Sequence, residues 1–536
     1  MALETPEPQT EAAAPAQQHA TSTQQHHAGS AGMPPWNVGE LDDAPHLSWR
    51  HWTQMLGPGL LMAGAAIGGG EWLMGPKVTA KYGGAVMWLA TLSLMAQVVY
   101  NVEASRYTLY SGEPIMLGKF RTLPGPIFWL FIYLALDFGS LFPYLAANAA
   151  TPVLALWLGK LPTPETVPEH KTALQWITYG VLMLSLLPLI FGGKIYNALR
   201  WVMGVKIVVV LGFLAFIAFW YSSAETWASI FGGLFQFGTV PVKGGGTENV
   251  FGSLLRGEGF PEFATEAIPP LAAFAAIAGV GGMAQSSVSN YTRDQGWGMG
   301  RHVGAIPSLV GGQNIELSHV GTVFTPTEET QRRWKRWYWH VLRDQLIIWM
   351  PACIIGVALP AMLSVEFLPR NIEPSDWTVA GMTADGVQAR VGGGLGQFYW
   401  YMILFCGFLV LVPSTSSSAD GFVRRWVDVS WTSLKSLRSM DPKKIRHFYF
   451  GFLSVYFISG LFLLSVAKPV GLLFIATTLN NFALGFSCFH TLYVNCSLLP
   501  RELRPSWITR ILLSCSGIFF ITLATITFMV AMKWIK

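Results

Sequence analysis

The sequence predicts an all-α protein that spans a membrane many times. Of its 536 residues, 52% are hydrophobic and 12% are charged, and the apolar residues fall in long blocks. Soluble domains carry about 25% charged residues, and a block of about 20 apolar residues spans the hydrocarbon core of a bilayer. These observations exclude a purely soluble fold, and the small net charge of +5 does not indicate nucleic-acid binding. The lipid bilayer is therefore the expected partner, whereas no motif predicts an oligomeric state.

The N-terminal segment differs from the rest of the chain. Residues 1–45 are rich in Ala, Pro, Gln, Thr and His and lack apolar periodicity. A segment of this composition cannot bury enough apolar surface to fold, so it predicts a disordered cytoplasmic tail. Residues 46–536 are expected to form a single transmembrane domain.

Eleven apolar spans follow the tail, and each is long enough to cross the membrane as a helix. The spans are approximately 57–80, 85–108, 126–150, 173–191, 198–220, 269–290, 340–363, 396–420, 446–466, 469–497 and 508–532.

The distribution of basic residues predicts the orientation, because cytoplasmic loops are enriched in Lys and Arg. With the N-terminus inside, 23 of the 35 Lys and Arg residues are cytoplasmic, including those of the two most basic loops, 291–339 and 421–445. We expect a cell-membrane protein with a cytoplasmic N-terminus and an outer C-terminus. The long outer loop 221–268 is expected to be a structured lid or cap, with a simple linker as the alternative.

Two spans carry glycine clusters near their middles. The clusters are Gly68, Gly69 and Gly70 in the first span and Gly279, Gly281 and Gly282 in the sixth. Each glycine in a helix interior costs about 1 kcal/mol relative to alanine, so three together favour local unwinding. Unwound backbone within a membrane lines a protein interior or a cavity, where free carbonyl groups bind cations. Close helix packing is the alternative explanation.

Each glycine cluster opens a set of five spans. The chain then divides into repeat one (57–220), repeat two (269–498) and an additional helix (508–532). This arrangement predicts a five-plus-five inverted repeat with discontinuous helices 1 and 6, which is an architecture of secondary transporters. The sequence contains no protease, nucleophile-elbow or selectivity-filter motif, so neither an enzyme nor a channel is favoured, and no cofactor is expected.

Ionisable side chains inside the spans are functional candidates because burying them in a membrane is costly. Glu71 directly follows the first glycine cluster, and Asp137 lies in the middle of the third span. Their structural alternatives are a favourable first-turn residue for Glu71 and a local hydrogen-bond acceptor for Asp137. Six others lie toward the cytoplasmic ends, where we expect them to snorkel or pair locally: Glu103, Arg106, Lys206, Arg343, Asp344 and Asp420.

Polar residues in the second half complete the candidate site. Met283 and Gln285 follow the second glycine cluster. The sulfur of methionine suits soft metals, and the amide oxygen of glutamine suits hard cations or polar substrates. For Met283, simple packing is the alternative. The hydroxyl groups of Pro413–Asp420 are expected to bond within their helix or line a path. Secondary candidates lie in the tenth span: Asn480, Asn481 and His490.

Several of these segments resemble the Nramp family of proton-coupled divalent metal transporters, which have the LeuT-type fold. GPGLLMAGAAIGGGE resembles the opening of the family's first helix, and SRYTLYSGEPI the end of its second. LALD, which ends at Asp137, resembles the ATD signature of the third helix. GVGGMAQ lies where the family has MPH, and VPSTSSSADG resembles the SGQSSTITG-like region of the eighth helix. The resemblance covers roughly residues 50–530.

The resemblance implies site residues, with departures from the family motifs. The metal-ligating Asp and Asn of the family's DPGN motif appear here as Gly68 and Glu71, and Ala284 and Gln285 replace the Pro and His of MPH. Met283 is retained, which implies a ligand role, and Asp137 is implied to relay protons. Glu71 is a candidate to replace the lost aspartate charge.

Two hypotheses follow for the function. The first is a secondary transporter that moves a divalent metal cation with proton coupling, using Gly68–Gly70, Glu71, Gly282, Met283 and Gln285. The second is the same scaffold with another substrate, either a hydrated hard cation or a small organic molecule, because the departures enlarge and neutralise the site.

Overall fold

The protein contains many membrane-length helices. The computed structural model describes residues 32–45, 57–163, 165–191, 194–310, 315–370, 379, 381–466 and 469–534. Eight helices in the described part are long and apolar enough to cross a membrane, so the chain is a multi-pass membrane protein. They are Gly84–Ser111, Phe138–Leu158, Val167–Ile190, Ile195–Tyr221, Glu328–Phe367, Gly393–Ser433, Pro442–Ser465 and Trp507–Ala531, and Pro126–Leu136 and Thr265–Ile277 are shorter apolar helices. The count of eleven spans and the repeat relation stay predictions.

The first half of the chain is helical up to the long loop 221–268. Its elements are α2 (Pro58–Ala66), η3 (Gly70–Met74), α3 (Gly75–Tyr82), η4 (Gly84–Val86), α4 (Trp88–Ser111), α5 (Ile115–Phe120), α6 (Pro126–Leu136), η5 (Phe138–Leu141), α7 (Tyr144–Leu158), α8 (Val167–Leu184), α9 (Leu187–Ile190) and α10 (Ile195–Tyr221).

The long loop 221–268, which the sequence predicts on the outer side, is structured, as expected. It contains α11 (Ala224–Gly233), an antiparallel pair of strands, β2 (Thr239–Pro241) and β3 (Thr247–Asn249), then α12 (Val250–Leu255) and η6 (Thr265–Ala267).

The second half contains the remaining helices. Its elements are α13 (Ile268–Ile277), η7 (Met283–Ser286), α14 (Ser287–Asp294), η8 (Gly298–His302), β4 (Thr322–Val323), α15 (Glu328–Arg343), η9 (Asp344–Trp349), α16 (Met350–Phe367), α17 (Met382–Val391), α18 (Gly393–Ser433), α19 (Lys435–Arg438), η10 (Pro442–Lys444), α20 (Ile445–Val466), α21 (Pro469–Ser497), η11 (Arg501–Leu503) and α22 (Trp507–Ala531).

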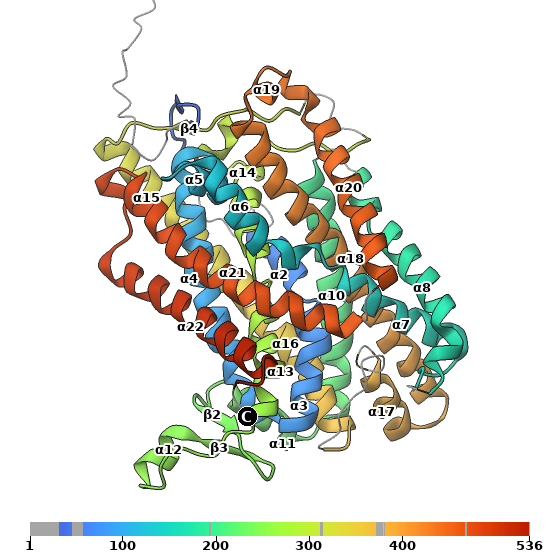
Figure 1. The fold of residues 1–536 in the computed structure, drawn as a ribbon. Helices are drawn as coiled ribbons and strands as arrows, with labels where there is room; N and C mark the ends of the chain where they lie inside the picture. The colour runs from blue at the N-terminus through green and yellow to red at the C-terminus, as the bar shows by residue number, and fades with distance from the viewer. Residues whose placement is uncertain are drawn as a thin grey trace, which may run out of the picture.

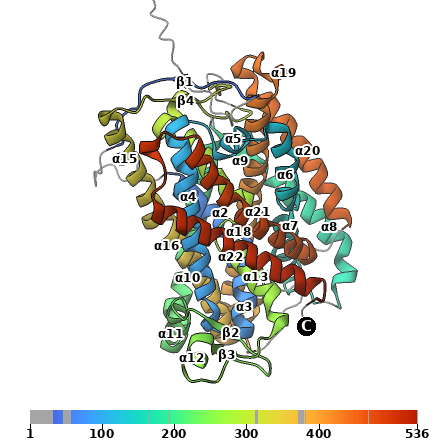
Figure 2. The same cartoon turned by 60° about the vertical axis from the view of Figure 1, so that its left-hand side comes forward.

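The connecting segments separate into two ends of the helical bundle. β2, β3, α11 and α12 lie at one end, and the C-terminus lies at the same end (Figure 1). β4 and α19 lie at the opposite end in both views (Figure 2). The segments that the sequence assigns to the two sides of the membrane are therefore apart in space. Which end faces the cytoplasm stays a prediction.

Part of the expected N-terminal tail is folded. β1 (Asn37–Val38) pairs in parallel with β4, and Leu41 is buried. The carbonyl oxygen of Leu41 accepts a hydrogen bond from Arg333 at 2.9 Å, and Asp43 forms an ion pair with Arg336 at 2.9 Å. The prediction of a disordered tail is therefore wrong for residues 33–45, because this stretch has an apolar anchor and acidic side chains that fit the basic α15. The rest of that prediction falls on residues 1–31, outside the described residues.

Two of the differences between the helices and the predicted spans bear on the site. The third span is divided: α6 ends at Leu136, and α7 begins only at Tyr144. Pro143 precedes α7, and because proline lacks an amide hydrogen it cannot continue a preceding helix. The eighth span is longer than predicted, since α18 continues to Ser433. Arg424 and Arg425, which the sequence placed in a loop, therefore belong to a membrane-spanning helix and are buried.

Candidate functional site

The two glycine clusters break their helices, and the breaks lie against each other. α2 ends at Ala66 and helical structure resumes with the π-helical turn η3, while α13 ends at Ile277 and η7 begins at Met283. Gly279 has a φ of +99°, a conformation that favours glycine. A Cβ atom at Gly70 would overlap the carbonyl oxygen of Ile277, so the two breaks meet backbone to backbone.

Glu71 connects the two breaks. Its Oε1 accepts a hydrogen bond from the amide of Gly279 at 3.0 Å, and its Oε2 accepts one from the amide of Gly68 at 3.1 Å. Broken helices leave amide groups without helical partners, and this buried carboxylate satisfies one from each break. Both oxygens therefore already have partners within the protein, and Glu71 is not among the residues that line the nearby cavity.

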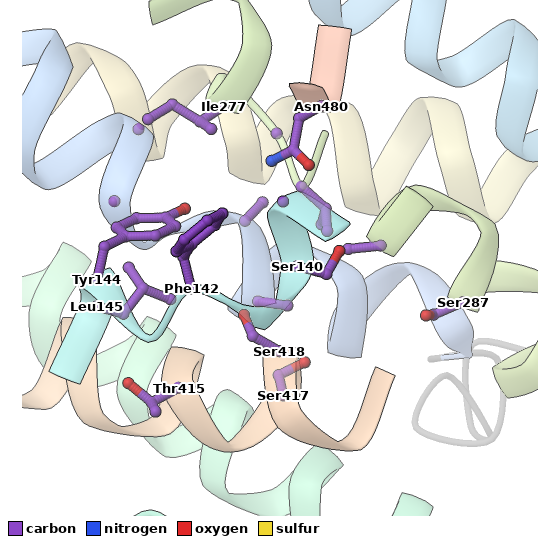
Figure 3. A pocket seen from close by; sticks show the side chains of 18 of the residues that line it. Ser140, Phe142, Tyr144, Leu145, Ile277, Ser287, Thr415, Ser417, Ser418 and Asn480 are labelled. Atoms are coloured by element: carbon purple, nitrogen blue, oxygen red, sulfur yellow. The ribbon is translucent and has the colours of Figure 1, made fainter. Parts of the chain in front are cut away.

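A cavity lies beside the breaks and has a volume of about 60 Å³. This is room for a few water molecules, since each needs on the order of 10–15 Å³. In Figure 3, Asn480 lies above the cavity, Ser417 and Ser418 of α18 lie below it, and Phe142 and Tyr144 lie at its side. The polar lining side chains are Ser140, Tyr144, Ser287, Tyr291, Thr415, Ser417, Ser418, Tyr456 and Asn480.

The chemistry of the cavity is polar but uncharged. Hydroxyl and amide groups, together with backbone at Gly69, Gly70 and Gly279, provide hydrogen-bond donors and acceptors. None of the described lining residues is ionisable near neutral pH, because the lining contains no Asp, Glu, Lys, Arg or His. Such a lining can orient a small polar solute, whereas it supplies no charge to a bare divalent ion.

Asp137 forms a buried ion pair next to the cavity. It lies at the end of α6, and its Oδ1 is 2.8 Å from an Nη atom of Arg425 in α18. Trp426 and Ser140 donate to the same carboxylate at 3.0 and 2.6 Å. Arg425 also donates to Ser287 at 3.1 Å, so the ion pair contacts two polar residues of the lining.

Three site residues predicted at the second break, Gly282, Met283 and Gln285, do not line the cavity, whereas Gly279 does. Met283 is fully buried in an apolar cluster with Met116, Leu117, Phe120, Tyr133, Val429 and Trp426. Gln285 donates to Asn101 at 2.6 Å and accepts from the amide of Gly281 at 3.2 Å. Gly282 lies where a Cβ atom would meet Asn480 Oδ1. Within the described residues, no group of three or more His, Cys, Asp and Glu side chains could hold a metal ion.

The secondary candidates in α21 divide between the cavity and structural contacts. Asn480 lines the cavity. Asn481 donates to the carbonyl oxygen of Ala272 at 3.2 Å, and His490 lies 2.8 Å from Thr122 and 2.7 Å from Tyr133. Of the predicted site residues, the structure therefore brings together Gly69, Gly70 and Asn480 at the cavity.

The sequence did not predict the aromatic side of the cavity, and the hydroxyl groups of the eighth span were not included among the predicted site residues. Phe142 and Tyr144 follow the unexpected break between α6 and α7, which an apolar run does not reveal. The hydroxyl-rich stretch of α18 was a usable signal, because Thr415, Ser417 and Ser418 line the cavity. Thr415 lines the cavity while its hydroxyl donates to Leu411 O at 2.9 Å.

The sequence predicts that Lys206 snorkels toward the cytoplasmic side or pairs locally, and this prediction is wrong. It is buried, and its ammonium group donates to the carbonyl oxygen of Gly64 at 2.7 Å and to Ser414 Oγ at 2.6 Å. The side chain does not snorkel because the end of α2 offers a carbonyl acceptor at its own depth.

Comparison with known proteins identifies the fold. No protein-family model matches the chain, and no curated protein matches it. Among solved structures, the chain is similar to a mutant of the manganese transporter of Eremococcus coleocola, with a TM-score of 0.59 and 11% identity over 92% of this chain and 90% of that chain. The same transporter in complex with an aromatic bis-isothiourea substituted compound matches with a TM-score of 0.53 and 12% identity over the same shares of the two chains.

A more distant similarity is to Mhp1, a nucleobase-cation-symport-1 family transporter, with a TM-score of 0.48 and 13% identity over 90% of this chain and 92% of that chain. The similarity to the Eremococcus transporter, taken with the two broken helices, shows that the chain shares the fold of that transporter.

Proposed function

We propose that the protein is a secondary active transporter and that its substrate, a small polar organic molecule, occupies the cavity beside the two helix breaks. The observation that carries this proposal is the uncharged, hydrogen-bonding lining at the meeting point of α2, α13 and α18. Secondary transporters bind their substrates near the membrane midplane at discontinuous helices.

The geometry favours an organic solute over a bare metal ion. Glu71, the expected compensating charge, already accepts two backbone hydrogen bonds. Met283, the expected sulfur ligand, packs among apolar side chains. A divalent ion in a membrane cavity needs negative compensation, and the described lining provides none.

A second candidate is a Nramp-like transporter that carries a divalent cation, hydrated or partly hydrated, with proton coupling. The similarity to a manganese transporter favours this candidate, as does the position of Glu71 between the two breaks. Asp137 would then relay protons, and protonation would release Arg425 toward the lining residue Ser287.

A ligand screen on the purified protein tests the two candidates. A panel of small polar organic molecules and the cations Mn²⁺ and Mg²⁺ is compared by the apparent unfolding temperature, because a ligand that binds only the folded state stabilises it. We expect stabilisation by an organic solute and weaker stabilisation in Asn480→Ala. The neighbouring variant Asn481→Ala is the matched control, since Asn481 contacts Ala272 rather than the cavity. Stabilisation by Mn²⁺ alone would overturn the organic substrate and support the second candidate.

Uptake into proteoliposomes with and without a pH gradient then tests transport and proton coupling. We expect accumulation of the stabilising ligand against its gradient. If Asp137 relays protons, Asp137→Asn should remove the effect of the pH gradient. Absence of uptake of any ligand that binds would contradict a transport function.

A further inference from the structure

Lys206 occupies an unusual position at the first helix break. It lies midway along α10, where α10 packs against α2 and α18. Gly64 permits the close approach of α2 and α10, because a Cβ atom there would overlap the side chain of Met203. The ammonium group reaches the backbone of α2 through this contact and donates to Gly64 O.

Glu71 and Lys206 bind the donor and the acceptor of one helical hydrogen bond that is missing at the break. In a continuous helix the amide of Gly68 would donate to the carbonyl oxygen of Gly64. Here that amide donates to the carboxylate of Glu71 at 3.1 Å, and the freed carbonyl oxygen accepts from the ammonium of Lys206 at 2.7 Å. The side chain of Glu71 thus satisfies the amide and the side chain of Lys206 satisfies the carbonyl, so these two side chains hold the break open.

The surroundings of the ammonium are oxygen atoms. Ser414 Oγ lies 2.6 Å from the nitrogen, and the same hydroxyl lies 3.4 Å from the carbonyl oxygens of Ala65 and Ile67. No carboxylate of the described residues forms an ion pair with Lys206 at contact distance. Carbonyl and hydroxyl oxygens at the C-terminal end of a half-helix are the donor set that binds a coupling cation in transporters with broken helices.

We propose that the ammonium group of Lys206 is a tethered cation that occupies an alkali-cation position at the end of α2. The protein therefore does not bind free sodium at this break, and removal of the ammonium creates a sodium site. This inference rests on the proposed transport function, because a coupling ion has a role only in a transporter.

The test measures sodium binding and needs neither the substrate nor transport. The apparent unfolding temperature of the purified protein is compared in sodium chloride and in choline chloride at equal ionic strength. In Lys206→Ala the oxygen atoms of Gly64 and Ser414 remain without the ammonium. We expect sodium to raise the unfolding temperature of this variant by about 2–5 °C. The wild-type protein should not respond to the exchange of salts.

Two variants serve as controls. Lys206→Met fills the same space with an apolar chain, so it should be insensitive to sodium. Lys119 is also buried, but its ammonium donates to the hydroxyl groups of Tyr100 and Ser487 rather than to the end of a broken helix. Lys119→Ala should therefore not acquire a sodium response.

The outcomes separate this inference from the transport function. An insensitive Lys206→Ala protein, or a wild-type protein that sodium stabilises equally, overturns the tethered-cation assignment. If Lys206→Ala does not fold, Lys206→Ser carries the same expectation, and sodium stabilisation of the wild type still overturns the assignment. Failure of the uptake experiment would instead remove the transport function and leave the sodium result standing.

Discussion

At the scale of single residues, two buried carboxylates have protein partners that the sequence does not reveal. Glu71 accepts amides from both breaks, and Asp137 pairs with an arginine nearly 300 positions away in the chain. Periodicity locates such residues in the membrane but says nothing about long-range partners. Their substitutions therefore have structural consequences that can be predicted only from the geometry.

Replacement of Glu71 should reduce stability. Glu71→Gln retains one acceptor oxygen, but its amide group would face the N–H of Gly68 or Gly279 and leave it without a partner. A buried donor without a partner costs about 1–3 kcal/mol, so a lower free energy of unfolding is expected in denaturation experiments. Glu71→Asp, which keeps the charge on a shorter chain, is the comparison. A Glu71→Gln protein that is as stable as the wild type but loses Mn²⁺ binding would instead assign the carboxylate to a metal.

Replacement of Asp137 should leave Arg425 buried without its counter-charge. The loss of one partner of a buried ion pair typically costs about 3–5 kcal/mol, so Asp137→Asn should be strongly destabilised. The double variant Asp137→Asn with Arg425→Met removes both charges, and we expect it to recover much of the lost stability. Thermal and chemical denaturation of the single and double variants measure this coupling. Equal stability of Asp137→Asn and the wild type would show that the ion pair does not hold the fold.

At the scale of secondary-structure elements, the sequence predicts the helix breaks better than the contacts between them. Glycine clusters correctly locate both breaks because the cost of glycine in a helix is local. The division between α6 and α7 and the extension of α18 were not predicted. The former depends on a single proline within an apolar run. The latter depends on buried partners for Arg424 and Arg425, which make a charged segment compatible with a transmembrane helix.

Contact between the two breaks can be tested at Gly70. Gly70→Ala places a Cβ atom against the carbonyl oxygen of Ile277 and should force the breaks apart. We expect a lower unfolding temperature and weaker ligand stabilisation. Gly204→Ala in α10 is the matched control, because no heavy atom lies within 4 Å of its added Cβ atom. The pair of breaks would not be in contact if Gly70→Ala behaved like Gly204→Ala.

At the scale of the whole molecule, the positions of the loops agree with the two sides that the basic residues predict. The strands β2 and β3 and the C-terminus share one end, and α19 lies at the other (Figures 1 and 2). The distribution of apolar and basic residues was sufficient to predict which connections share an end, because each membrane-spanning helix moves the chain to the other side of the bilayer. The direction of insertion depends on the surrounding membrane and is tested separately.

Labelling of single cysteines in intact cells determines the orientation. Lys243 is exposed in the turn between β2 and β3, and Ser436 is exposed in α19. Lys243→Cys should react with a membrane-impermeant maleimide, whereas Ser436→Cys should react only after the membrane is permeabilised. Both substitutions are made in a Cys515→Ser background, because Cys515 is exposed. The reverse labelling pattern would invert the predicted orientation.

The folded segment at residues 33–45 has a practical consequence for handling the protein. It runs over the end of the bundle that bears β4 and α15, and Arg121 donates to the carbonyl oxygen of Pro34 at 2.7 Å. Shortened versions of the chain that begin at residue 46, at the boundary composition suggests, would cut away this contact and uncover the apolar side chains beneath Leu41. A protease site or affinity tag is better placed before residue 32, so that cleavage leaves residues 33–45 in contact with the helical bundle.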